Sequence, residues 1–156
     1  MKKIVGISFI CILIDQIIKL IISINMNVAD SINVIKNFFR ITYLQNTGAA
    51  FSIFSGNRIF LILITLVALL LIYFILIKGK EITKVETICY GLLIGGIIGN
   101  LIDRIAFGYV IDFLDFLIFN YNFPVFNIAD TFIVISVFLI IIDTFRGDKN
   151  EVSSRS

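Results

Sequence analysis

The residues that could carry out chemistry in this sequence are mainly aspartates, asparagines and lysines, because its 156 residues include no histidine. Without histidine, the chain cannot form a serine–histidine–aspartate triad, a cysteine–histidine pair or a histidine-ligated metal site. The strongest acid–base group that remains is a pair of carboxyls that share one proton. The ionised carboxyl takes a proton from water, while the protonated one binds a carbonyl and protonates a leaving amine. Such a pair hydrolyses an amide without a metal ion or a covalent intermediate.

Five aspartates in or beside apolar stretches are the candidates for this pair: Asp15, Asp103, Asp112, Asp115 and Asp130. Asn100 precedes Asp103 by three residues, and Asn127 precedes Asp130 by the same spacing. Residues three apart lie on roughly one face of a helix, so each amide projects beside its carboxyl. Which two carboxyls meet depends on the elements that carry them.

The composition indicates that these elements are membrane helices. Hydrophobic residues make up 59% of the chain and charged residues 15%, and the mean hydropathy is +1.04. Soluble domains have roughly 45–50% apolar and about 25% charged residues, which excludes a soluble globular domain. Disorder is also excluded, since it needs low hydrophobicity and high charge. The net charge of +2 is too small to indicate a nucleic-acid partner, and Cys11 and Cys89 have no metal-site spacing.

Four stretches are long enough and apolar enough to cross a bilayer. The clearest is uncharged and lies between Arg58 and Lys78. Its nineteen residues rise about 28 Å as an α-helix, which is enough to cross the hydrocarbon. The other three are apolar but contain the polar residues discussed above. The predicted spans are residues 4–24, 59–77, 87–107 and 125–145.

The distribution of lysine and arginine predicts that both termini are cytoplasmic. Eight of these residues lie before the first span, between the second and third spans, or after the fourth. Three lie in the connection after the first span, on the other side. The richer side is normally cytoplasmic. We therefore expect a single membrane domain over residues 1–156, with a cytoplasmic tail at 146–156.

The connection after the first span is expected to form a small β element. Residues 38–44 (FFRITYL) are rich in aromatic and β-branched residues, and Gln45–Gly48 is typical of a turn. Residues 113–126 are dense in Phe and Tyr, as expected at a membrane interface. The predicted fold class is an all-α integral membrane protein with a small extracytoplasmic β element between helices 1 and 2.

In this orientation, separate stretches of the chain place polar groups at the level of the outer leaflet. Asp15 lies past the middle of the first span, Asp103 near the outer end of the third, and Asp130 in the first two turns of the fourth. Intramembrane ionisable residues are costly and usually face a bundle interior or a wet cavity. We therefore predict a polar site that opens outward. Depth favours Asp130 with one aspartate from residues 103–115, without deciding which.

Structural interpretations exist for several of these residues. Asp15 and Lys19 are four residues apart and can neutralise each other, and Arg104 can reach the lipid headgroups or pair with Asp103. A set of glycines is interpreted as a close-packing face for a neighbouring helix: Gly91, Gly95, Gly96 and Gly99.

Other functions are compatible with parts of this pattern. A serine–lysine dyad could use Ser23 and Lys19, but Asp15 already accounts for the lysine. A transporter or proton relay would need polar residues that continue inward, whereas the inner halves of the second and fourth spans are apolar. A non-catalytic assembly subunit would not require so many acids at one depth.

Five motifs contain the residues discussed above: Asp15-Gln16-x-x-Lys19, Asn46-Thr47-Gly48-Ala49-Ala50-Phe51-Ser52, Gly95-Gly96-x-x-Gly99-Asn100-Leu101-x-Asp103-Arg104, Val110-x-Asp112-Phe113 and Phe126-Asn127-x-Ala129-Asp130. On these motifs the chain resembles the lipoprotein signal peptidases (signal peptidase II), which are intramembrane aspartic proteases of bacteria. The motifs follow the family's order and spacing over roughly residues 4–145. One motif alone would be weak, and together they are highly specific.

The resemblance implies that Asp112 and Asp130 are the catalytic pair, because they occupy the aspartate positions of the V-x-D-F and F-N-x-A-D motifs. It implies a supporting role for Asp103. The other residues that it implies line or brace the site are Asn46, Gly48, Asn100, Arg104, Asn127, Asp15 and Lys19.

The resemblance also implies the substrate, a prolipoprotein whose lipobox cysteine carries a diacylglyceryl group. Cleavage would occur just before that cysteine, near the outer leaflet of the bacterial cytoplasmic membrane. The lipid chains can then stay in the hydrocarbon, so membrane lipid is an expected partner. Inhibitors of the globomycin type are expected to bind, and no cofactor or metal ion is implied.

Overall fold

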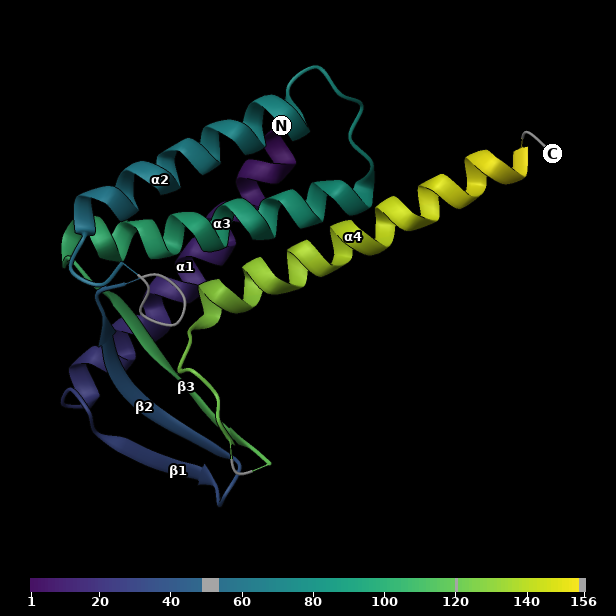
Figure 1. Cartoon of the computed structure of the whole chain (residues 1–156). Coiled ribbons are helices and arrows are strands. Elements are labelled where there is room, and N and C mark those ends of the chain that lie inside the picture. Colours follow the sequence, from purple (N-terminus) through teal and green to yellow (C-terminus); the bar gives the residue numbers. More distant parts are fainter. Residues whose placement is uncertain (49–53, 120, 155–156) are drawn as a thin grey trace.

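The computed structural model describes residues 1–48, 54–119 and 121–154, with their side chains up to Phe145 (Figure 1). Within these residues, four helical segments are long and apolar enough to cross a membrane. They are α1 (Lys2–Asn25), α2 (Arg58–Leu71) with its π-helical continuation η2 (Ile72–Ile77), α3 (Lys84–Ala106) and α4 (Ile128–Ser154).

The helices start and end a few residues away from the predicted bounds, for local reasons. Helix α3 begins at Lys84 because Thr83 and Glu86 form a reciprocal capping box. Helix α4 begins at Ile128 rather than at residue 125, and it continues as a helix to Ser154. The predicted tail from residue 146 is therefore helical through Ser154.

The sheet differs from the prediction, because it is not confined to the connection between the first two spans. Strands β1 (Ser31–Ile35) and β2 (Phe39–Asn46) come from that connection. Strands β3 (Val110–Ile118) and β4 (Tyr121–Asn122) come from the connection between α3 and α4. The antiparallel order is β1-β2-β3-β4. A strand has two hydrogen-bonding edges, and β2 pairs with β1 on one and β3 on the other.

The sheet lies at one end of the helices, and both termini lie toward the other end (Figure 1). The pairing of β2 with β3 runs from Phe39↔Phe116 to Asn46↔Val110. This register places Asp112 on a strand that leads directly from α3. Asp112 therefore lies on a strand that was not predicted, beyond the end of the third predicted span, and the sheet fixes its backbone.

Glycines bring α3 close to its neighbours. An added Cβ would lie 2.6 Å from Ile7 at Gly91, 2.7 Å from Cys11 at Gly95 and 2.7 Å from Asp15 at Gly99. These three glycines therefore pack on one face of α1, as predicted. Gly96 faces α4 instead, because an added Cβ there would lie 2.5 Å from the Ala129 carbonyl oxygen. Helix α3 is thus the centre of the bundle.

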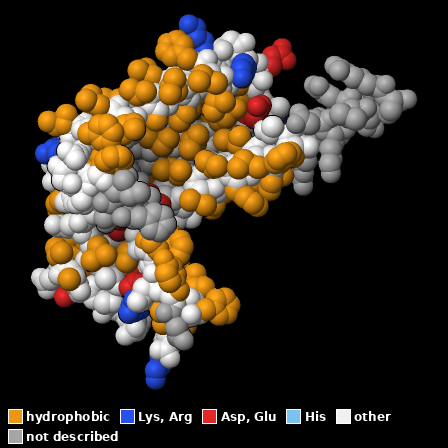
Figure 2. Space-filling model, in the orientation of Figure 1, with side chains coloured by type: hydrophobic (Ala, Val, Ile, Leu, Met, Phe, Trp, Pro, Cys, Tyr) orange, Lys and Arg blue, Asp and Glu red, His pale blue; other side chains and the backbone are white. Residues whose placement is uncertain are grey.

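Most of the helical surface is apolar. Figure 2 shows hydrophobic side chains over the helical region, with charged side chains mainly toward its ends. Within α2, Leu61 is the one buried residue among those described. A helix with so little of its surface inside the protein suits contact with lipid. The polar core lies elsewhere, where α1, α3, α4 and β3 meet.

Candidate active site

Asp130 is positioned by the capping of α4. The Asn127 Oδ1 atom accepts a hydrogen bond from the Asp130 amide (2.9 Å), and Asp130 Oδ2 accepts one from the Asn127 amide (3.2 Å). This reciprocal arrangement satisfies two amides that the first turn of a helix leaves without partners. It also holds the Asp130 carboxyl at the helix start, close to the sheet end of the bundle.

Asp112 is positioned by strand β3 and by two amides. Asn127 Nδ2 donates to Asp112 Oδ1 (2.7 Å), and Asn46 Nδ2 donates to Asp112 Oδ2 (2.9 Å). The Gly48 amide donates to Asn46 Oδ1 (2.9 Å), which turns the amino group of Asn46 toward the carboxyl. Arg104 Nη2 in turn donates to the Gly48 carbonyl (2.9 Å). Residues 49–52 of the same motif lie outside the described residues.

Asn100 and Asn127 connect the two carboxyls. Asn100 Nδ2 donates to Asp130 Oδ1 (2.7 Å), and Asn100 Oδ1 accepts from Asn127 Nδ2 (3.0 Å). Asn127 therefore contacts Asp112 through its amino group and Asp130 through its backbone and carbonyl groups. The side-chain amides of Asn46, Asn100 and Asn127 thus all donate hydrogen bonds to the two carboxyls, and none of these donors is charged.

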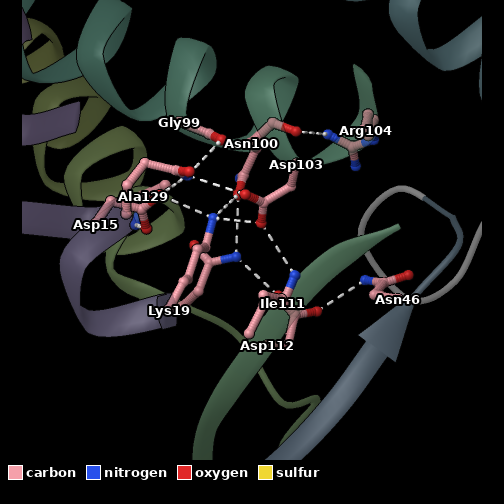
Figure 3. Close-up of polar contacts among 12 residues, drawn as sticks. Asp15, Lys19, Asn46, Gly99, Asn100, Asp103, Arg104, Ile111, Asp112 and Ala129 are labelled. Atoms are coloured by element: carbon pink, nitrogen blue, oxygen red, sulfur yellow. Dashed lines mark hydrogen bonds and ion pairs between the residues drawn. The ribbon is translucent and has the colours of Figure 1, made fainter. Parts of the chain in front are cut away.

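A second group of polar residues lies next to this pair and contains a fully buried lysine. Lys19 Nζ lies 2.8 Å from Asp15 Oδ2 and 3.0 Å from Asp103 Oδ2, and it donates to Asn100 Oδ1 (3.0 Å). Figure 3 shows Lys19 pointing from α1 toward Asn100 and Asp103 of α3. The ion pair between Asp15 and Lys19 that their spacing indicated does form, and Asp103 shares it.

Each carboxylate of this second group also accepts a hydrogen bond from a backbone amide. In both cases the amide belongs to the residue that precedes a member of the Asp112–Asp130 pair. Asp15 Oδ1 accepts from the amide of Ala129, which precedes Asp130 (3.0 Å). Asp103 Oδ2 accepts from the amide of Ile111, which precedes Asp112 (3.1 Å; Figure 3). A buried charge with a partner charge and further hydrogen bonds is a rigid anchor. The ion group thus positions both carboxyls through their chain neighbours.

Asp115 belongs to neither group. Its carboxylate lies 2.9 Å from Arg40 Nη2 and accepts a hydrogen bond from Thr42 Oγ1 (2.7 Å), both on β2. The serine–lysine alternative also has no geometric basis, because the half-buried Ser23 donates to the Leu20 carbonyl (3.0 Å). Lys19 is meanwhile buried against Asp15 and Asp103.

A cavity of about 540 Å³ opens beside the Asp112–Asp130 pair. Its polar end contains Asn46, Asn100 and Arg104 together with both aspartates. Its opposite wall is apolar and includes Phe123, Pro124, Val125, Phe126, Ile133 and Val134. An apolar cavity with a few convergent polar groups is the usual form of a substrate site.

Burial and charge both act on the protonation of Asp112. The side chain is 3% exposed, and the loss of solvation together with the charge of Asp130 raises the pKa of Asp112 to about 7. The hydrogen bonds from Asn46 and Asn127 act in the opposite direction and lower this pKa. Near neutral pH, Asp112 is therefore a carboxyl that can hold or release a proton.

Except for Asp115, the structure brings together the candidate aspartates that the sequence pattern placed in one polar site. Gln16 was missed, although it lies in the first motif. Its Nε2 atom donates to Asp103 Oδ1 (2.9 Å) and to the Gly99 carbonyl (3.2 Å), which links α1 to α3. A polar residue next to Asp15 in an apolar span was the signal that could have identified it. The wall residues Ile133 and Val134 carried no such signal, because they resemble any lipid-facing residue.

Comparisons with known proteins agree with these features. The sequence matches the family described as Signal peptidase (SPase) II over residues 7–146. A lipoprotein signal peptidase of Halothermothrix orenii is 47% identical over 142 residues, which cover 90% of this chain and 93% of that protein. A lipoprotein signal peptidase of Staphylococcus aureus (strain JH9) is 40% identical over 145 residues, 93% of this chain and 89% of that protein.

Solved structures share the fold as well. A bacterial membrane enzyme whose structure was determined by the in meso method at 2.3 Å resolution superposes with a TM-score of 0.88. Its sequence is 38% identical, and the match covers 96% of this chain and 92% of that chain. Another, determined by the same method at 1.9 Å, has a TM-score of 0.82 and 39% identity, covering 92% and 93% of the two chains.

Proposed function

Because this chain belongs to the signal peptidase II family, a family of aspartic peptidases, we propose that Asp112 and Asp130 are the carboxyls with which it cleaves prolipoproteins. The chain is a multi-pass bacterial membrane protein, and its function is that of a lipoprotein signal peptidase. The remaining questions concern which residues act, on which form of the substrate, and on which side of the membrane.

One observation carries the assignment of the pair. Of the five candidate aspartates, Asp112 and Asp130 are the two that line the cavity. Among the described residues, neither has a lysine or arginine within 4.0 Å, whereas Asp15, Asp103 and Asp115 each have one. The ion-paired carboxylates are engaged by a cation within the protein, whereas the two carboxyls that line the cavity are placed to meet a substrate.

The chemistry then follows from one proton on the coupled pair. With that proton on Asp112, the Asp112 hydroxyl donates to the carbonyl oxygen of the scissile amide. Asp130 accepts a proton from a water molecule, whose oxygen bonds to the carbonyl carbon. The carbon–nitrogen bond then breaks, and the leaving amine takes a proton from the pair. The products are a carboxylic acid on the signal peptide and a free amine on the lipoprotein.

The substrate is proposed to be the diacylglyceryl-modified precursor. The cavity joins the polar pair to an apolar wall that includes Phe123, Val125 and Phe126, which suits a peptide that carries lipid chains. The same wall is proposed to receive inhibitors of the globomycin type. The pair lies toward the sheet end of the bundle, which is proposed to face outward, with both termini in the cytoplasm.

A processing assay tests this proposal. Purified protein is given diacylglyceryl-modified prolipoprotein, and loss of the signal peptide is followed on a gel with and without globomycin. The Asp112→Asn and Asp130→Asn variants should each lose at least about a thousandfold in rate while remaining folded. The Asp115→Asn variant is the matched control, because it removes a carboxyl from the same strand without touching the cavity. Turnover by either member of the pair, or equal cleavage of unmodified precursor, would contradict the corresponding part of the proposal.

Labelling of substituted cysteines tests the orientation. A Lys36→Cys variant should react with an impermeant reagent from outside, and a Lys80→Cys variant should react only from inside. The native Cys11 and Cys89 are buried and give a low background. The reverse labelling pattern would overturn the proposed topology.

A further inference from the structure

We propose that the end of the bundle opposite the sheet holds a binding site for an anionic phospholipid. A second cavity of about 540 Å³ lies there, between the start of α1 and the connection that leads from η2 to α3. Four lysines line it: Lys2, Lys3, Lys78 and Lys80. This cavity shares no residue with the catalytic one, so the proposal is independent of the proposed catalytic pair.

The lysines converge because two helix ends meet at this level. Lys2 and Lys3 open α1, and Lys78 follows the last residue of η2. The Lys78 amide donates to the Tyr73 carbonyl (2.8 Å), which closes the wide final turn. Gly79 then adopts φ +73°, a left-handed conformation that glycine adopts without strain, and the chain turns back with Lys80 beside the cavity.

The charge of these lysines is not neutralised by the carboxylates that the structure describes, although Lys78 Nζ lies over the Phe74 ring, 4.9 Å from its centroid. Among the described residues, none of the four has a carboxylate within 4.0 Å, and no acidic side chain lines the cavity. Of the acids at this end of the bundle, Glu86 accepts from the Thr83 amide (2.8 Å) as part of the α3 cap, and Glu81 is exposed. Asp143 of α4 lies near Cys89 and Tyr90 but does not line the cavity. Concentrated positive charge at a membrane surface attracts a phosphate group.

An apolar groove continues from this cavity. The groove shares Lys3, Ile82 and Thr87 with the lysine cavity. Its other lining residues are Lys84 and the apolar set Gly6, Ile7, Ile10 and Ile88. The surface over Gly6 is open, since an added Cβ there would meet no atom within 4 Å.

A phosphate between the lysines with acyl chains along the groove would fill both spaces. A free anion would occupy only the lysine-lined cavity, and a neutral lipid would occupy only the apolar groove. The combination of uncompensated charge and adjoining apolar groove therefore favours an anionic phospholipid over either. Because the cavity lies between α1 and η2, the bound lipid would also link the otherwise lipid-surrounded second span to the bundle.

Lipid retention in detergent tests the proposal. Delipidated protein is mixed with phosphatidylglycerol or with phosphatidylcholine of the same acyl chains, and bound lipid is counted by native mass spectrometry. Phosphatidylglycerol should bind at least about tenfold more tightly and raise the melting temperature. The Lys78→Gln/Lys80→Gln variant should weaken its binding by about 30-fold, and Lys80→Gln alone by about fivefold. Lys36→Gln, which makes the same charge change on the sheet, should have no effect.

Three results would overturn the proposal. The two lipids could bind equally, the Lys36→Gln variant could weaken binding as much as Lys80→Gln, or soluble glycerol phosphate could raise the melting temperature as much as the lipid does. The melting temperature of each variant without lipid shows that it is folded. Cleavage by Lys78→Gln/Lys80→Gln in detergent should remain within about twofold of wild type, since these lysines lie away from the catalytic cavity.

Discussion

Two groups of carboxyls lie side by side in this protein, and they differ in how their charge is compensated. Asp15 and Asp103 share the ammonium group of Lys19, at 2.8 and 3.0 Å. Asp112 and Asp130 have asparagine amides as partners and face a cavity. A shared cation offsets the charge of the first two carboxylates, whereas neutral amides orient the second two carboxyls without offsetting their charge. The first group therefore suits anchoring, and the second suits proton transfer.

The two groups are joined at Asn100. Its Oδ1 accepts from Lys19 Nζ, which is a group that only donates, so its Nδ2 must face Asp130. Lys19 thus sets the orientation of an amide that contacts the proposed catalytic pair. Together with the hydrogen bonds from Ala129 and Ile111, this makes the ion group a support for the geometry of the pair.

Removal of the buried cation should have the largest effect on this arrangement. Lys19→Met leaves two buried carboxylates without their cationic partner, which should lower the free energy of unfolding by about 3–5 kcal/mol and abolish cleavage. Melting can be followed with a thiol-reactive dye, because Cys11 and Cys89 are buried until the protein unfolds. The Lys19→Met/Asp15→Asn/Asp103→Asn variant should recover part of the stability. A Lys19→Met protein that melts like wild type would show that the ion group is no anchor.

The Asp112–Asp130 pair should determine how the cleavage rate depends on pH. Because the pKa of Asp112 is raised to about 7, higher pH removes the proton that the pair must share. The rate should then fall about tenfold per pH unit, to about a hundredth of its maximum at pH 9. The Asp115→Asn control should follow the same curve. A rate that stays constant between pH 7 and 9 would show that the proton on Asp112 is not required.

A smaller effect is expected when the α3–α4 contact is widened. Gly96→Ala would place a Cβ 2.5 Å from the Ala129 carbonyl oxygen and 2.8 Å from Ile133. The start of α4 must then move, which should cost about 1–3 kcal/mol of stability and reduce the cleavage rate at least about tenfold through misplacement of Asp130. Gly6→Ala, also a helical glycine but with open space around it, should be neutral in the same melting and cleavage assays. Equal behaviour of the two variants would argue against the close contact.

The smallest predicted effect comes from one of the amides. Asn46→Ala removes the hydrogen bond to Asp112 Oδ2, a bond that lowers the pKa of Asp112. The alkaline limb of the rate profile should therefore move to higher pH, by about one unit or less. Asn33→Ala, an exposed asparagine on β1, is the matched control and should leave the limb in place. A shift to lower pH in Asn46→Ala would contradict the role given to this amide.

Much of the fold was predictable because it depends on properties within single segments. Hydropathy over about 20 residues was sufficient to predict the four spans, and the spacing of Gly91, Gly95 and Gly99 predicted the face that packs on α1. The common level of Asp15, Asp103 and Asp130 also followed from their depth along separate helices. The extension of the sheet into Val110–Ile118 did not follow, because strand pairing joins segments that are distant in the chain.

The roles of the individual aspartates depended on the tertiary structure. Asp103 was predicted near the outer end of the third span and Asp112 just after it, and depth did not decide which of them pairs with Asp130. Only the motifs shared with a known family separated them. In the folded protein, Asp103 meets Lys19 from α1, while Asp112 meets amides from β2 and from the start of α4. Hydropathy is a sum over neighbouring residues, whereas compensation of a buried charge depends on the few side chains that folding brings within about 3 Å of it.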